Sequence, residues 1–468
     1  MDKRKTFIKS TIVYFAGNVL MKLMTFILLP IYTNYLSKTD IGIYEEAVSV
    51  VTFFAMTIFL NIWSTILRYM YEYQERHEKS KAINNGLFIT FVSFFLYTFL
   101  FYIYNYFVPV NQAIYVYLYG VFTILHYIYG NIARGYGKNI LYALSGVLAS
   151  LITLLTNIFL IVFLNFGIES LYISVVIGYL LQIFIIEWKL RILSSFKKRD
   201  LSKTILISYL KFSIPISIST LISWFLDGYN KVYISQNMGY SENGLYSVAG
   251  KFSGALSLIA SVIILAWQEM AFKNAESENV SEKNTTYSTA INSYLYYMTY
   301  GIALLLPAIS IVFPYLIKKD FIESYPYVPF HIFGTALSTF MNFYSQIFFA
   351  DKKTISVTLS FGIAALTNFL LLPKLLLALG IQGANLSIII SYILGLLCMY
   401  MATRKTISLK FLSLKNILGF VLLFLGYWVY TYNSLIISLI FIIIGMGLFL
   451  YSEKQNVLLL KDLIKKRN

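Results

Sequence analysis

The chain has very little charge for its length. Only 12% of its 468 residues are Asp, Glu, Lys or Arg, whereas 58% are hydrophobic and the mean hydropathy is +0.70. In a soluble globular domain about a quarter of the residues are charged, so this composition excludes a soluble protein with a charged surface. We therefore interpret the chain as an integral membrane protein that is embedded over nearly its whole length.

Cysteine and histidine are also scarce. Cys398 is the only cysteine, and the three histidines lie far apart in the sequence. An intrachain disulfide, a CxxC redox motif and a cysteine-rich zinc site are therefore excluded, and no histidine spacing fits a metal site. The stretch GLYSVAGKF has five residues between its glycines instead of four and no Ser or Thr after Lys251, so it is not an ATP-binding loop. We expect no metal and no cofactor.

Long apolar stretches recur along the whole sequence. A helix needs about 20 apolar residues to cross the hydrocarbon core, and the pattern predicts an all-α protein with fourteen spans: 9–34, 41–62, 86–107, 113–133, 140–164, 170–188, 206–235, 243–268, 286–314, 326–349, 355–374, 381–402, 412–430 and 433–451. The first span is expected to be retained as a helix. The loops are short, and this absence of a domain for catalysis favours a transporter over an enzyme.

Basic residues are distributed unequally between the two sides that these spans define. Of the 37 Lys and Arg, 29 fall in the terminal segments and loops of one side, five in the loops of the other side, and three in or beside spans. The side rich in Lys and Arg is the cytoplasmic side of a membrane protein. The net charge of +16 is therefore a topology signal and no sign of nucleic-acid binding, and both termini are expected in the cytoplasm.

Two short segments suggest an internal repeat. SKTDIGIYEEA (37–47) and GYSENGLYSVA (239–249) align with an acidic residue, then Gly-x-Tyr, then Ala in register. Paired halves are a common plan in transporters, with the substrate site between them. We accordingly predict a six-helix lobe over 1–203, a second over 204–406, and two further helices with a basic tail over 407–468.

Ionisable residues inside spans are the candidate site residues. A charge in a span costs about 2.5–3.5 kcal/mol on insertion scales, so it usually faces water or a partner. Lys22 and Lys251 are expected to face a hydrated cavity that accepts an anion. Asp227 and Lys231 lie one helical turn apart and can pair or bind jointly. For Glu45, Glu46 and Lys231 the membrane interface is the simpler expectation.

Aromatic residues make up 18% of the chain, including 40 tyrosines. Tyr and Trp collect at both membrane interfaces, so most of them are expected to form interfacial belts. Stacking on sugar rings is an alternative for Tyr229 and Tyr246. His126, in the fourth span, is expected to be a packing residue.

Two stretches carry a resemblance to a known family. GNVLMKLMTFILLPIYTNYLSKTDIGIYEEAVSV (17–50) and FSIPISISTLISWFLDGYNKVYISQNMGYSENGLYSVAGKF (212–252) resemble the first two and the seventh and eighth helices of the polysaccharide/O-antigen (Wzx-like) flippases. These belong to the multidrug/oligosaccharidyl-lipid/polysaccharide (MOP) exporter superfamily. The resemblance implies two six-helix lobes in a MATE-like fold, with Lys22, Asp227 and Lys251 at positions that face the space between them.

The same resemblance implies a function. A member of this family moves an undecaprenyl-pyrophosphate-linked oligosaccharide of O-antigen, capsule or exopolysaccharide across the bacterial inner membrane by alternating access, coupled to H⁺ or Na⁺. A polysaccharide polymerase and chain-length proteins are the implied partners. The alternatives are a multidrug or cation antiporter, a flippase for the peptidoglycan lipid precursor and, from another class, a membrane glycan polymerase or ligase. The short external loops argue against the last of these.

Overall fold

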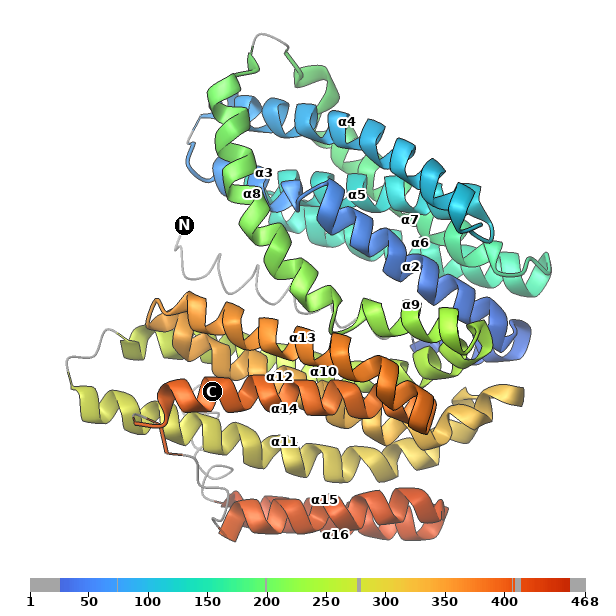
Figure 1. The fold of residues 1–468 in the computed structure, drawn as a ribbon, viewed down its shortest axis with the longest axis vertical. Helices are drawn as coiled ribbons and strands as arrows, with labels where there is room; N and C mark the ends of the chain where they lie inside the picture. Colours follow the sequence, from blue (N-terminus) through green and yellow to red (C-terminus); the bar gives the residue numbers. More distant parts are fainter. Residues whose placement is uncertain are drawn as a thin grey trace, which may run out of the picture. The chain divides into compact units, whose positions relative to one another are not determined.

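The computed structural model describes residues 26–73, 75–197, 200–275, 279–405, 407–408 and 414–454, and within these ranges it contains helices and no strand (Figure 1). This confirms the predicted all-α fold. Residues 26–35 are helical, and the helices that follow are α2 (Lys38–Ile58), α3 (Ile62–Met70), α4 (Arg76–Phe107), α5 (Ala113–Gly135), α6 (Asn139–Ile158), η1 (Phe159–Phe163), α7 (Glu169–Leu190), η2 (Leu193–Ser195), α8 (Lys203–Trp224), α9 (Gly228–Asn237), α10 (Tyr240–Ala275), α11 (Val280–Leu316), η4 (Lys319–Tyr327), α12 (Val328–Ala350), α13 (Thr354–Leu379), α14 (Ile381–Thr403), α15 (Leu414–Tyr432) and α16 (Leu435–Ser452).

Twelve helices in the described part of the chain are long and apolar enough to cross a membrane. Each lies at one of the predicted spans, so the chain is a multi-pass membrane protein. The predicted span 326–349 is also helical, as α12, but is not one of the twelve. The predicted span 9–34 lies mostly outside the described residues, and Lys22 lies outside them. The count of fourteen therefore stays a prediction.

The predicted span 206–235 is two helices. α8 ends at Trp224 and α9 begins at Gly228, and a break inside a membrane frees backbone groups that need new partners. The side-chain nitrogen of Asn368 donates to the carbonyl oxygen of Phe225 at 2.7 Å and to Oδ1 of Asn230 at 2.7 Å. Asn368 on α13 therefore supplies a donor to one backbone carbonyl at the break and holds the first turn of α9.

Proline inside α11 shapes the packing of a different helix. Pro307 has no N–H to donate to the carbonyl of Ala303, four residues earlier. Gly426 of α15 lies against this carbonyl, and a Cβ at Gly426 would lie 2.4 Å from its oxygen, which is too close for two non-bonded atoms. The absence of a side chain thus lets α15 approach the part of α11 where the ladder of hydrogen bonds is interrupted.

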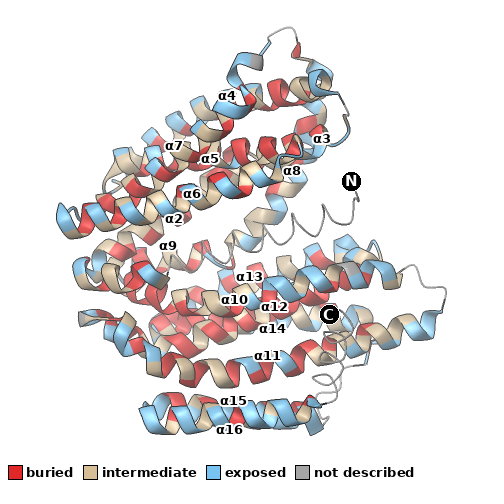
Figure 2. Cartoon of the chain, turned by 180° about the vertical axis from the view of Figure 1, so that it is seen from behind, coloured by how far each residue is buried: buried red, intermediate tan, exposed pale blue. Residues whose placement is uncertain are grey.

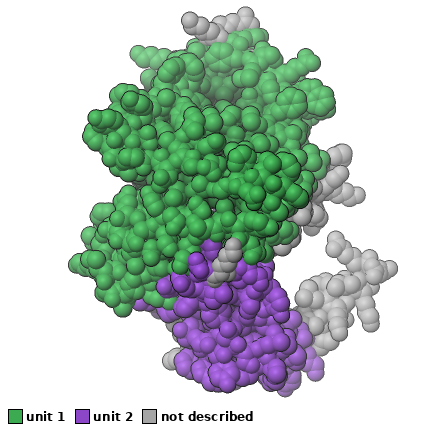
Figure 3. All heavy atoms as spheres, turned by 90° about the vertical axis from the view of Figure 1, so that its right-hand side faces the viewer, with its two compact units in different colours: residues 1–251, 365–384 green, residues 252–364, 385–468 purple. Residues whose placement is uncertain are grey.

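Contacts divide the chain into two compact units, which Figure 3 colours separately. The first unit comprises residues 1–251 and 365–384, and the second comprises 252–364 and 385–468. In the first unit α7 packs on α5 and α6, and α2 packs on α8 and α9; in the second, α11 packs on α12, α15 and α16. The predicted lobe boundaries at 203 and 406 stay a prediction.

Burial differs strongly between helices (Figure 2). In α5 the buried residues include Tyr119, Thr123 and Ile128, whereas in α16 only Ser438 and Gly445 are buried. An apolar helix with so little buried surface must expose most of its side chains to lipid. α16 therefore lies at the periphery of the second unit, and α5 lies in the interior of the first.

Candidate functional site

Glu45 is the centre of a buried charge cluster in the first unit. It lies inside α2 and is 4% exposed. Its Oε2 lies 3.0 Å from Nζ of Lys231 on α9, and its Oε1 lies 2.5 Å from Nζ of Lys251 on α10. The lysine side chains are 21% and 30% exposed. α2 thus meets two consecutive helices that lie far from it in sequence, and one carboxylate contacts two ammonium groups.

Local sequence signals set the position of Glu45 on α2. Ser37 caps the helix: its Oγ accepts from the amide of Asp40 at 3.1 Å, while Oδ2 of Asp40 accepts from the amide of Ser37 at 3.0 Å. This reciprocal arrangement satisfies N–H groups that have no partner within the helix. It fixes where α2 begins and places Glu45 two turns into the helix.

The break between α8 and α9 positions Lys231. Nε1 of Trp224, the last residue of α8, donates to the carbonyl oxygen of Ser49 on α2 at 2.9 Å. Asn230, which is fully buried, bonds to Asn368 and donates to the hydroxyl of Tyr246 at 3.3 Å. The end of α8 is therefore anchored to α2 and the first turn of α9 to α10 and α13, just before Lys231, whose side chain reaches Glu45.

The three groups in contact carry one net positive charge, because two lysines share one carboxylate, and the nearby carboxylate of Asp227 offsets this charge. Asp227 is exposed and interacts electrostatically with Lys231, but the close partner of this lysine is Glu45. Asp227 and Lys231 therefore interact, but the ion pair of Lys231 is made with Glu45 on another helix, and joint binding by Asp227 and Lys231 stays a prediction.

The other predicted residues have different environments. Glu46, the neighbour of Glu45, is half-buried and hydrogen-bonds with the hydroxyl of Tyr240 at the start of α10. Lys22 lies outside the described residues. Glu45 is buried in an ion cluster, where the sequence had favoured an interfacial position. Whether any of these residues binds a substrate stays a prediction.

Buried tyrosines behind Glu45 were not predicted. Tyr44 on α2, Tyr119 on α5 and Tyr172 on α7 form a cluster with ring centroids 5.1 to 6.4 Å apart. The hydroxyl of Tyr32 accepts a hydrogen bond from Asn157 on α6 at 2.9 Å. The interior of the first unit is thus aromatic and polar beside the charge cluster. Most tyrosines had been expected in interfacial belts, and Tyr44, Tyr119 and Tyr172 had not been placed in the interior.

His126 packs inside the first unit. Its ring stacks on that of Tyr179 with centroids 4.2 Å apart and an interplanar angle of 23°. This contact agrees with the predicted packing role. Among the described residues no group of three or more His, Cys, Asp or Glu side chains could hold a metal ion.

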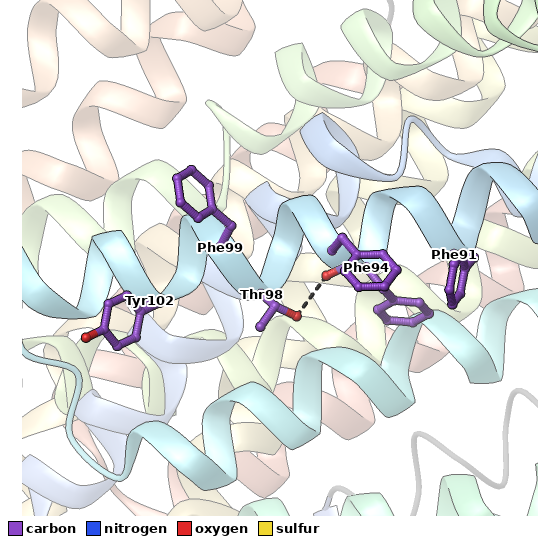
Figure 4. A pocket seen from close by; sticks show the side chains of 6 residues that line it. Phe91, Phe94, Thr98, Phe99 and Tyr102 are labelled. Carbon is purple, nitrogen blue, oxygen red and sulfur yellow. Dashed lines mark hydrogen bonds between the residues drawn. The ribbon is translucent and has the colours of Figure 1, made fainter.

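A pocket of about 540 Å³ lies on α4, away from the charge cluster in sequence (Figure 4). It is lined by Phe91, Phe94, Phe95, Thr98, Phe99 and Tyr102, and the hydroxyl of Thr98 donates to the carbonyl of Phe94. These residues come from one helix, and Phe91, Phe95, Phe99 and Tyr102 are exposed. Such a surface on a membrane helix contacts lipid tails, and it contains none of the predicted site residues.

The sequence profile of the family described as "Polysaccharide biosynthesis protein" matches residues 7–268, which is more than half of the chain. The matched range contains Glu45, Lys231 and Lys251. A search of curated proteins gave no significant match.

Solved structures show what fold the chain has. The structure of the lipid II flippase MurJ in an inward closed conformation aligns over 95% of this chain and 99% of its own, with a TM-score of 0.72 at 16% identity. An inward-facing multidrug resistance MATE family transporter of the MOP superfamily aligns over 84% of this chain and 96% of its own, with a TM-score of 0.64 at 16% identity. The MATE-like fold predicted from the sequence is confirmed.

Proposed function

Because the chain belongs to the polysaccharide biosynthesis protein family, we propose that it is a flippase for an undecaprenyl-pyrophosphate-linked oligosaccharide. It moves the repeat unit of an O-antigen, capsule or exopolysaccharide across the bacterial inner membrane by alternating access. Both termini lie in the cytoplasm, in agreement with the distribution of Lys and Arg, and the movement is coupled to H⁺ or Na⁺. A polysaccharide polymerase and chain-length proteins are partners in the same process.

The observation that supports this function is the charge cluster around Glu45. Buried charges in a membrane protein are costly and are retained at substrate and ion pathways. The diphosphate of a lipid-linked sugar is a compact anion, and the ammonium group of lysine binds phosphate as a compact point charge. Lys231 and Lys251 lie within 3.0 Å of the same carboxylate, so the two cations are close enough to act on one diphosphate.

Glu45 has a defined role in this mechanism. In the absence of the anion it neutralises part of the charge of the two lysines, which would otherwise remain unpaired in a low-dielectric interior. A diphosphate that enters the site takes over this pairing. The large hydrophilic headgroup then occupies a protein-lined space while the prenyl chain remains in lipid, so that no sugar is exposed to hydrocarbon.

The test follows the headgroup across the membrane. The purified protein is reconstituted in liposomes with a fluorescent undecaprenyl-pyrophosphate oligosaccharide, and the fraction accessible to a membrane-impermeant quencher is measured over time. We expect protein-dependent accessibility that is lost in Lys251→Met and Lys22→Ala and kept in Lys283→Met, whose lysine pairs with Asp351 in the second unit. Equal rates for all variants would overturn the role of the cluster.

The alternative functions give different results in parallel assays. Accessibility of a fluorescent peptidoglycan lipid precursor, with none for the oligosaccharide lipid, would assign the chain to precursor flipping. Efflux of a cationic dye from a sensitised host, with no lipid translocation, would assign it to drug or cation antiport. Chain growth on a supplied lipid-linked acceptor would assign it to a glycan polymerase or ligase.

A further inference from the structure

The first turns of α2 and α10 cross in very close contact. A Cβ at Gly42 on α2 would overlap the carbonyl oxygen of Tyr240 on α10, and a Cβ at Gly244 on α10 would overlap the carbonyl oxygen of Lys38 on α2. The side-chain nitrogen of Asn243 donates to the carbonyl oxygen of Gly42 at 2.8 Å. Only glycine permits this approach, since every other residue carries a Cβ.

The two matching segments of the sequence contact each other in the same way from both sides. Residues 42 and 244, and residues 38 and 240, occupy equivalent positions of the two matching segments and differ by the same 202 positions. Gly42 of the first segment meets Tyr240 of the second, while Gly244 of the second meets Lys38 of the first. The two copies therefore pack on each other with local two-fold symmetry, and each supplies one glycine.

This crossing lies close to the charge cluster along both helices. Glu45 follows Gly42 by three residues, about 4.5 Å along the helix axis, and Lys251 follows Gly244 by seven residues, about 10 Å. The ion pair between Glu45 and Lys251 joins the same two helices as the glycine crossing. A tight backbone contact and an ion pair thus hold α2 against α10 between the starts of these helices and the cluster.

We propose that this reciprocal glycine crossing is a lock that closes access to the charge cluster from the side of the membrane where α2 and α10 begin. The lock is released when the first turns of α2 and α10 separate. The inference rests on the proposed function in one respect, namely that the cluster must open to each side of the membrane in turn. It assigns to Gly42 and Gly244 the closure of one of these openings.

Ser247 offers a site for measuring closure. It occupies the position in the second segment that Glu45 occupies in the first, it is 4% exposed, and its hydroxyl has no hydrogen-bond partner among the described residues. A cysteine there replaces a hydroxyl that has no bond to lose. The single native cysteine is removed by Cys398→Ser, so that Ser247→Cys is the only thiol in the protein.

The experiment measures the reaction of this thiol with a membrane-impermeant reagent in nanodiscs, relative to the denatured protein. Gly42→Ala and Gly244→Ala are introduced separately and together. The control is Gly254→Ala on the same helix, where a Cβ would meet no atom within 4 Å. We expect slow labelling in the parent and in the control, and at least about tenfold faster labelling in each glycine variant, because the added methyl group forces the helices apart.

A second variant covers the case in which the alanine variants do not fold, which is monitored by gel filtration and thermal unfolding. Lys251→Met removes the ion pair that joins α2 to α10, leaves Glu45 paired with Lys231, and is also expected to accelerate labelling. Equal rates in Gly42→Ala, Gly244→Ala and Gly254→Ala would overturn the lock. Where the alanine variants are lost, an unchanged rate in Lys251→Met would overturn it.

Labelling and flipping report on different proposals. Faster labelling of the glycine variants in a protein that moves no lipid-linked sugar would uphold the lock and contradict the proposed substrate. Flipping by the parent, with labelling rates that do not respond to either glycine, would uphold the substrate and contradict the lock.

Discussion

Both units contain carboxylates paired with lysines, but the pairs lie at different places on their helices. In the first unit Glu45 lies within α2, and its partners come from two other helices. In the second unit Asp351 follows the last residue of α12 and pairs with Lys283 at 2.7 Å, and Glu453 follows the last residue of α16 and pairs with Lys415 at 2.9 Å.

An ion pair at the end of a helix has a different role from an ion pair in the interior of a helix. At a helix end a long charged side chain can reach water and the headgroups. Lys415 is 59% exposed, although the carboxylate of Glu453 with which it pairs is only 5% exposed and also accepts a hydrogen bond from Tyr297. A carboxylate inside a helix, 4% exposed, has lost its water and depends on its partners. Position along the helix, more than the presence of an ion pair, marks Glu45 as a candidate functional residue.

The largest effect is expected from removing the carboxylate of the first unit. Glu45→Gln leaves two lysines without their anion, and breaking a buried pair costs about 3–5 kcal/mol. We expect a clear loss of thermal stability in detergent and loss of lipid flipping. Glu45→Asp, which keeps the charge, is the control and should retain part of both properties; equal damage by both substitutions would show that shape, and not charge, is required.

A smaller loss of stability is expected from removing one lysine. Lys251→Met leaves Glu45 paired with Lys231, so the unfolding free energy should fall by about 1–3 kcal/mol, while flipping should fall much further because one of the two cations is gone. The double variant Glu45→Gln/Lys251→Met should lose less stability than the sum of the single variants. Additive losses would mean that the two side chains do not interact.

The smallest effect is expected in the second unit. Asp351→Asn removes one partner of a pair at a helix end whose side chains are 20% and 21% exposed, where the expected cost is about 0–1 kcal/mol. Flipping rates should remain at the parent level. If Asp351→Asn abolished flipping in a stably folded protein, the distinction between helix ends and helix interiors would fail, and the second unit would contain a functional charge as well.

The sequence was sufficient to predict the positions of the membrane-spanning helices that the structure describes. Apolar windows predicted twelve helices that the structure contains, since the length of a membrane helix is set by bilayer thickness. It was insufficient for the break after Trp224. Pro215 lies inside α8 without ending it, whereas the carbonyl of Phe225 at the break accepts from Asn368, which lies 143 residues later in the chain. No local pattern reports a partner at that distance.

The sequence singled out the three residues of the charge cluster as candidates, but it did not predict which of them pair. Glu45, Lys231 and Lys251 each stood out as charges in apolar surroundings. The nearest acidic residue in sequence, Asp227, was the natural partner for Lys231 by helical spacing, but the structure joins this lysine to Glu45, 186 residues away. Helical spacing indicates which residues are close on the same helix, whereas the partner of Lys231 comes from a different helix through tertiary packing.

The separation within the charge cluster also constrains how the protein is made. Lys231 and Lys251 follow Glu45 by 186 and 206 residues, and ribosomes add about 5–20 residues per second. The carboxylate of α2 is therefore synthesised about 10–40 s before its last partner. During that interval the nascent membrane protein holds an acidic group that it cannot yet neutralise with these lysines, so the charge cluster can form only after Lys251 of α10 has been synthesised.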